Sequence, residues 1–188
     1  MSALPEKPLN RRARRLLPAD TVRGMPTLLV LRHAAAQSHA ASDHERVLTA
    51  QGRRDAATVG RALAVTQTPD RALVSSARRA HETFVTARDH GAWHADVEVL
   101  DALYHGAPDE VIAAVADHAG DSGTLLLVGH EPWCSGLIGL LTGARVRMEA
   151  AALGSLQVGP SWDALDPQWC ALQWFATPRT LAGLVDRR

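Results

Sequence analysis

The chain has 188 residues, of which 46% are hydrophobic and 21% charged, and its formal net charge is zero. These values are typical of one globular domain with a substantial core, and they give no electrostatic reason to expect nucleic-acid or membrane binding. No apolar run is long enough to span a bilayer, so we expect no membrane partner.

The two cysteines, Cys134 and Cys170, lack the spacing of a metal site. Two cysteines in a domain of this size favour free thiols in a reducing compartment, so we predict a cytoplasmic protein.

Residues 1–24 differ from the rest of the chain in charge. They hold six of the 20 basic and two of the 20 acidic residues, which leaves 14 basic and 18 acidic residues in 25–188. We predict a disordered basic extension at 1–24 and a folded domain at 25–188. The extension is either a gene-model artefact, with the true start at Met25, or a basic arm for a partner. The composition fits both interpretations.

The first predicted strand, residues 27–31, is a short aliphatic run that ends at Arg32 and His33. In open α/β sheets, ligands bind beyond the carboxyl ends of the strands. A cation beside an imidazole suits an anionic phosphoryl group, with the histidine as nucleophile. An Arg-His pair in this position is more often a hydrogen-bonded surface corner, so the interpretation depends on the rest of the chain.

A loop of small and polar residues, 34–47, comes next, and we interpret its side chains as solvated. A helix is predicted to follow, with Thr49 as its N-cap. The second strand, 71–75, runs directly into a helix that continues to about His90. The first turn of a helix favours anions through its free N–H groups and its dipole. Arg79 lies in this turn, and its planar guanidinium can donate two hydrogen bonds to a phosphate.

The second half of the chain repeats this pattern. A third strand, 96–100, leads to Asp101, and a helix begins near Pro108. The clearest buried strand, 124–128, ends in Gly129 and His130, and another helix follows. Two histidines and an arginine would then converge if these strands are parallel neighbours.

The alternation of strands and helices predicts the fold class. It favours an α/β protein, a three-layer α/β/α sandwich with a mostly parallel central sheet. Residues 153–158 and 169–176 are predicted to be the last two strands, and 181–185 a short tail.

Three segments together resemble a known family. Leu31–Ala34, Ser75–Thr83 and Val128–Pro132 are similar to the Arg-His-Gly/Ala, Ser-Pro-x-x-Arg-Ala-x-x-Thr and Gly-His-x-Pro motifs of the histidine phosphatase (phosphoglycerate mutase-like) superfamily, with Ser76 in the usual proline position. Two further groups of residues resemble the SixA-like branch of phosphohistidine phosphatases: Leu48 and Thr49 with Gly52, and Trp174 with Pro178 and Arg179. The resemblance spans roughly residues 26–180.

The resemblance implies roles for four side chains. His33 would accept the phosphoryl group, while Arg32, Arg79 and His130 would bind the substrate phosphate and neutralise the transferring group. It implies no metal and no other cofactor. The partner would be a phosphorylated small molecule or a phosphoprotein, and the oligomeric state is left open.

The general acid departs from the family pattern. Many members carry a glutamate in the loop after the third strand, whereas the nearest carboxylates here are Glu98 and Asp101. We favour Asp101, at the strand end, with a capping role as the alternative. A phosphohistidine or phosphoanhydride needs an acid less than an alkyl phosphate does. The chain lacks a large insertion, so we also predict an open pocket.

The predicted function is a metal-independent phosphatase that hydrolyses phosphomonoesters or phosphohistidine through a covalent phosphohistidine on His33. One alternative is a sugar- or nucleotide-phosphate phosphatase or a mutase-like enzyme of the same superfamily. Another is a weakly catalytic protein that binds a phosphorylated partner. A zinc hydrolase using His90 and His94 is disfavoured, because Gly91 stands where a metalloprotease motif has glutamate.

Overall fold

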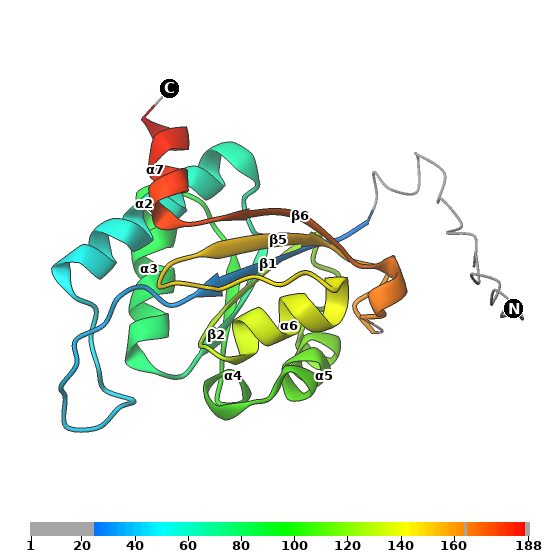
Figure 1. Ribbon diagram of the computed structural model, residues 1–188, viewed down its shortest axis with the longest axis horizontal. Coiled ribbons are helices and arrows are strands. Elements are labelled where there is room, and N and C mark those ends of the chain that lie inside the picture. The colour runs from blue at the N-terminus through cyan, green and yellow to red at the C-terminus, as the bar shows by residue number, and fades with distance from the viewer. Residues whose placement is uncertain (1–24, 164, 187–188) are drawn as a thin grey trace, which may run out of the picture.

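A six-stranded sheet runs through the middle of the protein (Figure 1). The computed structural model describes residues 25–163 and 165–186, so the prediction for 1–24 lies outside the described residues. The strands are β1 (Thr27–Arg32), β2 (Arg71–Ser75), β3 (Asp96–Leu100), β4 (Thr124–Gly129), β5 (Leu153–Gln157) and β6 (Ala171–Ala176). Their order is β3-β2-β4-β1-β5-β6. Strands β1 to β4 run parallel to one another, β5 pairs antiparallel with β1, and β6 pairs antiparallel with β5, so only β5 runs against the other strands and the sheet is mostly parallel, as predicted.

Helices cover both faces of the sheet (Figure 1). One face carries α2 (Ala50–Thr66), α3 (Arg78–Gly91) and α7 (Pro178–Val185), and the other carries α4 (Ala102–His105), α5 (Pro108–His118) and α6 (Trp133–Thr142). Each face has its own buried cluster, and the central strand β1 supplies both, with Leu28 and Val30 on one side and Leu29 and Leu31 on the other. The predicted three-layer α/β/α sandwich is confirmed. Burial of both faces explains why β1 and β4 are unbroken apolar runs.

The parallel strands bring the chemically important residues to one edge. Arg32 at the end of β1 is in register with Gly129 at the end of β4, and Val74 of β2 is in register with Val128 of β4. The residues that follow these positions therefore lie at neighbouring strand ends. This geometry assembles the candidate site from segments that are far apart in the sequence.

The ends of the helices test the predicted caps. Thr49 caps α2 as predicted, since its Oγ1 accepts a hydrogen bond from the Gly52 N–H at 3.0 Å. The prediction of a tail at 181–185 is wrong, because Pro178–Val185 form helix α7. Thr177 is its N-cap and proline occupies the first turn, which are ordinary helix-start signals. Leu181 is buried against the sheet and anchors the helix.

The C-terminal strand also starts later than predicted. Pro167–Trp169 form a short 3-10 helix, and β6 begins only at Ala171. Cys134 and Cys170 are both free, as predicted. Among the residues that the structure describes, no helix has the length and apolar character needed to cross a membrane.

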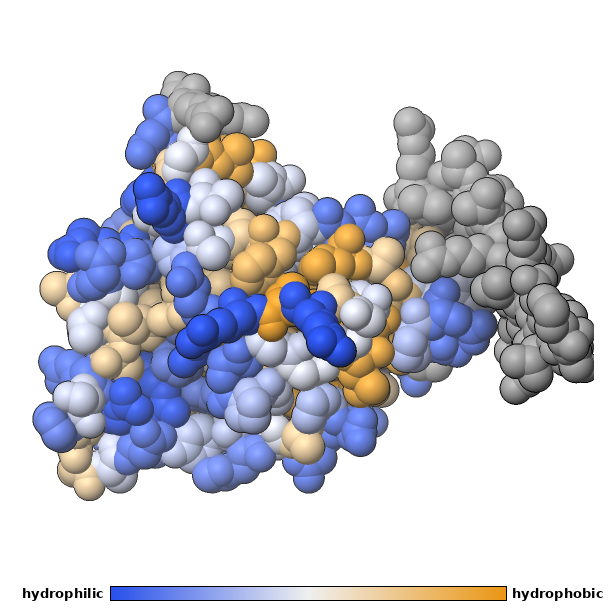
Figure 2. Space-filling view, in the orientation of Figure 1, coloured by the Kyte–Doolittle hydropathy of each residue, from blue (hydrophilic) through white to orange (hydrophobic). Residues whose placement is uncertain are grey.

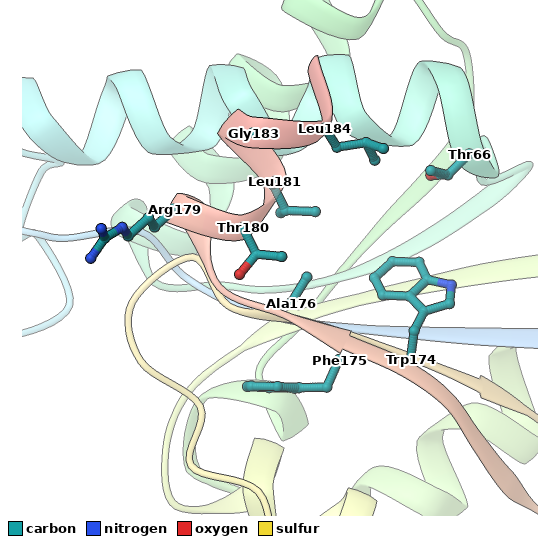
Figure 3. Close-up of a pocket in the computed structure, with 9 residues that line it drawn as sticks. All are labelled: Thr66, Trp174, Phe175, Ala176, Arg179, Thr180, Leu181, Gly183 and Leu184. Atoms are coloured by element: carbon teal, nitrogen blue, oxygen red, sulfur yellow. The ribbon is translucent and has the colours of Figure 1, made fainter. Parts of the chain in front are cut away.

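Figure 2 shows apolar side chains gathered over α6, β6 and α7, between hydrophilic margins. Leu140 of α6 and Leu184 of α7 are among the exposed large hydrophobic residues. Beside this region lies the pocket of Figure 3, with a volume of about 880 Å³, between α7, β6 and the end of α2. Trp174, Phe175 and Leu181 contribute to its mostly apolar lining, and it includes none of the four residues of the predicted phosphate site.

The contact between α2 and α3 depends on Gly60. A Cβ at this position would lie 1.8 Å from the carbonyl oxygen of Ala87, so the two helix backbones would have to separate. We expect Gly60→Ala to lower the free energy of unfolding by about 1–3 kcal/mol, measured by urea denaturation. Gly183→Ala in α7 is the matched control, because its Cβ meets nothing within 4 Å. The control should be neutral or stabilising, and equal midpoints for the two variants would contradict the packing argument.

Candidate active site

His33 lies directly after β1 and is fixed at both ring nitrogens. Its Nδ1 lies 2.8 Å from the backbone oxygen of Ala34, which can only accept, so Nδ1 carries the proton. The Nε2 atom is then left with a lone pair, and the Nε–H of Arg79 donates to it at 3.2 Å. The backbone N–H of His33 donates to Gly129 O at 2.8 Å, which ties the residue to β4. The histidine thus presents an oriented, unprotonated nitrogen.

The environment keeps His33 neutral. The pKa of His33 is lowered from 6.5 to about 4, first by burial and then by the nearby charges of Arg79 and Arg32, against the opposing effect of the Ala34 carbonyl. At neutral pH the imidazole is therefore unprotonated, which is the form required of a nucleophile.

Arg79 lies in the first turn of α3, where the sequence predicts it, and is only 6% exposed. Its helix is held against the nucleophile by Thr83, whose Oγ1 accepts a hydrogen bond from the Ala34 N–H at 3.0 Å. Thr83 Oγ1 also donates to the Arg79 carbonyl at 2.6 Å. The guanidinium is therefore positioned by both the helix and the strand end.

Arg32 is the last residue of β1. Its Nη1 donates to Met148 O at 2.7 Å, which fixes the side chain against the segment before β5. Its Nε is buried and has no hydrogen-bond partner within residues 25–163 and 165–186. A buried donor without a partner is costly, and an anionic oxygen would satisfy it.

His130 follows β4 and lies beside His33, with ring centroids 4.9 Å apart. The Ser75 Oγ lies 2.7 Å from His130 Nε2 and accepts a hydrogen bond from the Ala77 N–H, so its own O–H can donate to the imidazole. The proton of His130 is then on Nδ1, which is buried and without a partner in the described part of the chain. His130 thus supplies a second unpaired donor next to the nucleophile.

The two candidate acids, Glu98 and Asp101, lie in different surroundings. Glu98 forms ion pairs with Arg71, at the start of β2, and with His118, so it is engaged toward the opposite end of the sheet. Asp101 follows β3 at the expected edge, is exposed and precedes α4 without a side-chain capping bond. No hydrogen bond or ion pair links its side chain to the four residues above in the described structure. The role of Asp101 as acid stays a prediction.

Solved structures with the same fold include SixA proteins. The protein assigned as phosphohistidine phosphatase SixA in Nakamurella multipartitia has 31% sequence identity and a TM-score of 0.74, over 82% of this chain and 97% of that chain. The protein histidine phosphatase SixA in complex with tungstate has 23% identity and a TM-score of 0.73, over 82% and 99%, and shows likeness of fold.

A sequence relative matches this chain over the whole of its own length. An uncharacterized protein of Mycobacterium tuberculosis, Rv1276c, is 32% identical over 162 residues, which cover 79% of this chain and 100% of that protein. No family model matches. The chain belongs to the SixA-like branch of the histidine phosphatase superfamily. This membership supports a phosphatase function that acts on phosphorylated substrates.

Two motif residues outside the phosphate site, Gly129 and Ser76, have structural roles that the contacts explain. Gly129 precedes His130 because a Cβ there would lie 1.8 Å from the ring of Trp133. That ring in turn donates from Nε1 to Leu103 O at 3.1 Å and so ties α6 to α4. Ser76, in the usual proline position, lies 3.0 Å through its Oγ from His44 Nε2 of the loop after β1.

Two site residues of this family member were missed by the sequence analysis. Asp43 belongs to the loop interpreted as solvated, yet it forms an ion pair with Arg79 at 3.0 Å. Tyr104 of α4 donates from its hydroxyl to Asp43 Oδ2 at 2.9 Å, and its ring lies 5.5 Å from the His130 ring, centroid to centroid. Burial, then the hydrogen bond to Asp43, raises the pKa of Tyr104, so the phenol is protonated at neutral pH. Tyr104 closely follows the end of β3, which is a weak signal in the sequence, whereas nothing in the sequence distinguishes Asp43 from a solvated loop residue.

The disfavoured zinc interpretation finds no helical ligand pair. Helix α3 ends at Gly91, so His94 does not share a helix with His90.

The two histidines of the site predict a loss of stability in acid. Burial lowers the pKa of His130 to about 3 and that of His33 to about 4, whereas both titrate near 6.5 in an unfolded chain. Below pH 6.5 the unfolded state binds more protons, so the free energy of unfolding falls as the pH drops from 6.5 toward 4. The loss at pH 5 should be on the order of 1–2 kcal/mol per histidine.

Urea denaturation at pH 7 and pH 5 measures this effect. The His130→Asn variant should lose less stability between the two pH values than the wild type does. Equal losses in the two proteins would show that His130 does not resist protonation in the folded state.

Proposed function

We propose that this protein is a metal-independent phosphatase that uses His33 as a covalent nucleophile on phosphohistidine or phosphomonoester substrates. The observation that carries the proposal is the state of His33: its Nδ1–H is bound to Ala34 O, and its Nε2 lone pair contacts Arg79. A neutral imidazole with one free, oriented nitrogen and an arginine beside it suits attack on phosphorus.

In the first step, His33 Nε2 attacks the phosphorus atom in line with the bond to the leaving group. The N–P bond forms while the P–leaving-group bond breaks, and the leaving group departs with the electron pair and takes up a proton. The imidazole becomes cationic, and its Nδ1–H remains bound to the Ala34 carbonyl. In this proposal Asp101 is the candidate source of the proton for leaving groups that need one.

Three donors would stabilise the transferring group. The Nε–H of Arg79 turns from His33 to a phosphoryl oxygen, while Arg32 Nε and His130 Nδ1, which lack protein partners in the described residues, donate to the other oxygens. Guanidinium and N–H donors fixed before the reaction stabilise the developing charge without reorganisation.

In the second step, a water molecule attacks the phosphorus of phosphohistidine. The N–P bond breaks with its electron pair returning to His33 Nε2, and His33 is neutral again with its proton still on Nδ1. The protons of the water leave on the inorganic phosphate, except that one passes to Asp101 where Asp101 has donated its own to the leaving group. Water has access to the site, since Asp43 at its mouth is exposed. An open mouth also supports a substrate carried on a protein surface.

The decisive experiment is a substrate panel with the wild-type protein. It compares a phosphohistidine protein, sugar phosphates, nucleotides and an aryl phosphate, each with and without a metal chelator. We expect turnover of phosphohistidine and the aryl phosphate, no effect of the chelator, and inhibition by tungstate, the oxyanion found with the SixA structure. A preference for sugar phosphates or nucleotides would favour the other phosphatases of the superfamily.

Two results would overturn the proposal. Failure on every substrate, together with measurable phosphate binding, would make the protein a phosphate-binding module. Loss of turnover in the chelator would require a metal.

A further inference from the structure

A carboxylate lies within the proposed phosphate site. Asp43 contacts Arg79 twice, since Nη2 is 3.0 Å from the carboxylate Oδ2 and Nη1 donates to the backbone oxygen at 2.7 Å. The Nε of the same guanidinium contacts the nucleophile His33. One arginine therefore connects the nucleophile to a fixed anion. An anion in this position weakens the binding of phosphate, so its presence needs a function.

Asp43 is held in place by more than Arg79. Its Oδ1 accepts from Arg46 Nη1 at 2.9 Å, and its Oδ2 accepts from the Tyr104 hydroxyl at 2.9 Å. These two bonds, the Arg46 bond first, hold the pKa of Asp43 well below its usual range. The loop is anchored to α3 next to this residue, because the Arg78 N–H donates to His44 O at 3.0 Å. The carboxylate is therefore ionised and held in place by Arg46, Tyr104 and Arg79.

The geometry places Asp43 on the side of the leaving group. In-line attack puts the leaving group on the far side of the phosphorus from His33 Nε2. Arg79 contacts His33 through Nε and Asp43 through the opposite end of the guanidinium, so Asp43 marks the end away from the nucleophile. The Asp43 side chain is 54% exposed, whereas that of Arg79 is 7% exposed, so this end also faces solvent. A departing group leaves past Asp43 and Tyr104.

We propose that Asp43 is a specificity-determining residue that disfavours substrates with a negative charge on the leaving group and favours neutral or cationic ones. This inference rests on the proposed function, because it concerns the same phosphoryl transfer. It assigns the substrate class as phosphoryl groups carried on neutral or cationic groups, and it disfavours compounds with a carboxylate or second phosphate beside the reacting one. The discrimination is roughly threefold to tenfold, since water screens a half-exposed carboxylate.

Phenyl phosphates that carry a meta carboxylate, carboxamide or aminomethyl group provide the test. They share the reacting centre and differ in the charge of the leaving group. The measured quantity is the ratio of kcat/KM for the cationic and anionic substrates, in wild type and in Asp43→Asn. Asparagine keeps the shape of the side chain and one oxygen, which can accept from Arg46 or from Tyr104, because these two residues donate to different oxygens of Asp43. Comparing the ratio between proteins cancels differences in leaving-group basicity.

Glu45→Gln is the matched control. It removes one negative charge from the same loop, and Glu45 lies 3.7 Å from His44 and 3.8 Å from Arg78 rather than against Arg79. We expect Asp43→Asn to lower the ratio threefold to tenfold and to strengthen inhibition by inorganic phosphate, and Glu45→Gln to change neither. The wild-type ratio should also fall as salt is raised, because exposed charges are screened.

The outcomes separate the two proposals. If wild type hydrolyses none of the three phosphates, the proposed function itself fails. If wild type hydrolyses them and Asp43→Asn leaves the ratio unchanged, the specificity role is overturned. A uniform loss on all three substrates also overturns it, because Asp43 would then act only by positioning Arg79.

Discussion

Replacing His33 with alanine is expected to abolish phosphatase turnover, with kcat on an aryl phosphate falling on the order of 10⁴-fold or more. No other imidazole of the site can substitute, because the Nε2 of His130 is bound to Ser75 and its Nδ1 carries the proton. The covalent intermediate should disappear together with turnover. Rapid quenching with a labelled substrate measures it as acid-labile, protein-bound phosphate in wild type and its absence in His33→Ala.

His39→Ala is the matched control for this variant. His39 is an exposed histidine of the loop between β1 and α2, and its removal should change kcat less than twofold. Urea denaturation of His33→Ala establishes that the variant is folded, and retained binding of inorganic phosphate establishes that the arginines are in place. Substantial turnover in folded His33→Ala would mean that water attacks the substrate directly, without a phosphohistidine.

The sequence predicted the parts of the site that depend on strand ends. Arg32, His33 and His130 were predicted because β1 and β4 are apolar on both faces, and such strands are central and parallel. Residues after parallel neighbouring strands must lie at one edge, so their closeness follows from the class of fold. Arg79 was predicted for a similar reason, since the first turn of the helix after β2 lies at that edge. The structure brings all four together.

Asp43 and Tyr104 could not be predicted in the same way. Asp43 contacts a residue 36 positions away in the chain, and Tyr104 reaches Asp43 across 61 positions. The loop that holds Asp43 and the short helix α4 that holds Tyr104 show no periodic pattern in the sequence, and long-range hydrogen bonds such as these hold them in place. An exposed aspartate in a polar loop has the same local signature whether it is solvated or bound to arginine. Helix α7 differs, because its Thr-Pro start was visible in the sequence and was read as the end of a strand.

Arg79→Ala is expected to lower kcat/KM about 10³-fold, because it removes a guanidinium that contacts the nucleophile. Arg79→Lys should regain only a small part of this loss, since an ammonium is a point charge and lacks the planar guanidinium that can donate to a phosphoryl oxygen through Nε while its other end binds Asp43. Arg78→Ala is the matched control from the neighbouring position. The Arg78 side chain is 55% exposed and pairs with Glu45 and Glu82, so we expect a change below threefold.

The variant also tests how Asp43 and Arg79 act together. In Arg79→Ala the Asp43 carboxylate stays at the mouth of the site and loses one of the two cations that pair with it, Arg79 and Arg46, so part of the lost activity is repulsion of the phosphoryl group. The double variant Asp43→Asn/Arg79→Ala should therefore be several-fold more active than Arg79→Ala, although Asp43→Asn alone gives no comparable gain on a neutral substrate. Such coupling is expected only for residues in one electrostatic network. Equal activity of Arg78→Ala and Arg79→Ala would show that Arg79 does not act in the site. If the effects of Asp43→Asn and Arg79→Ala on activity are strictly additive, Asp43 only holds the loop in place.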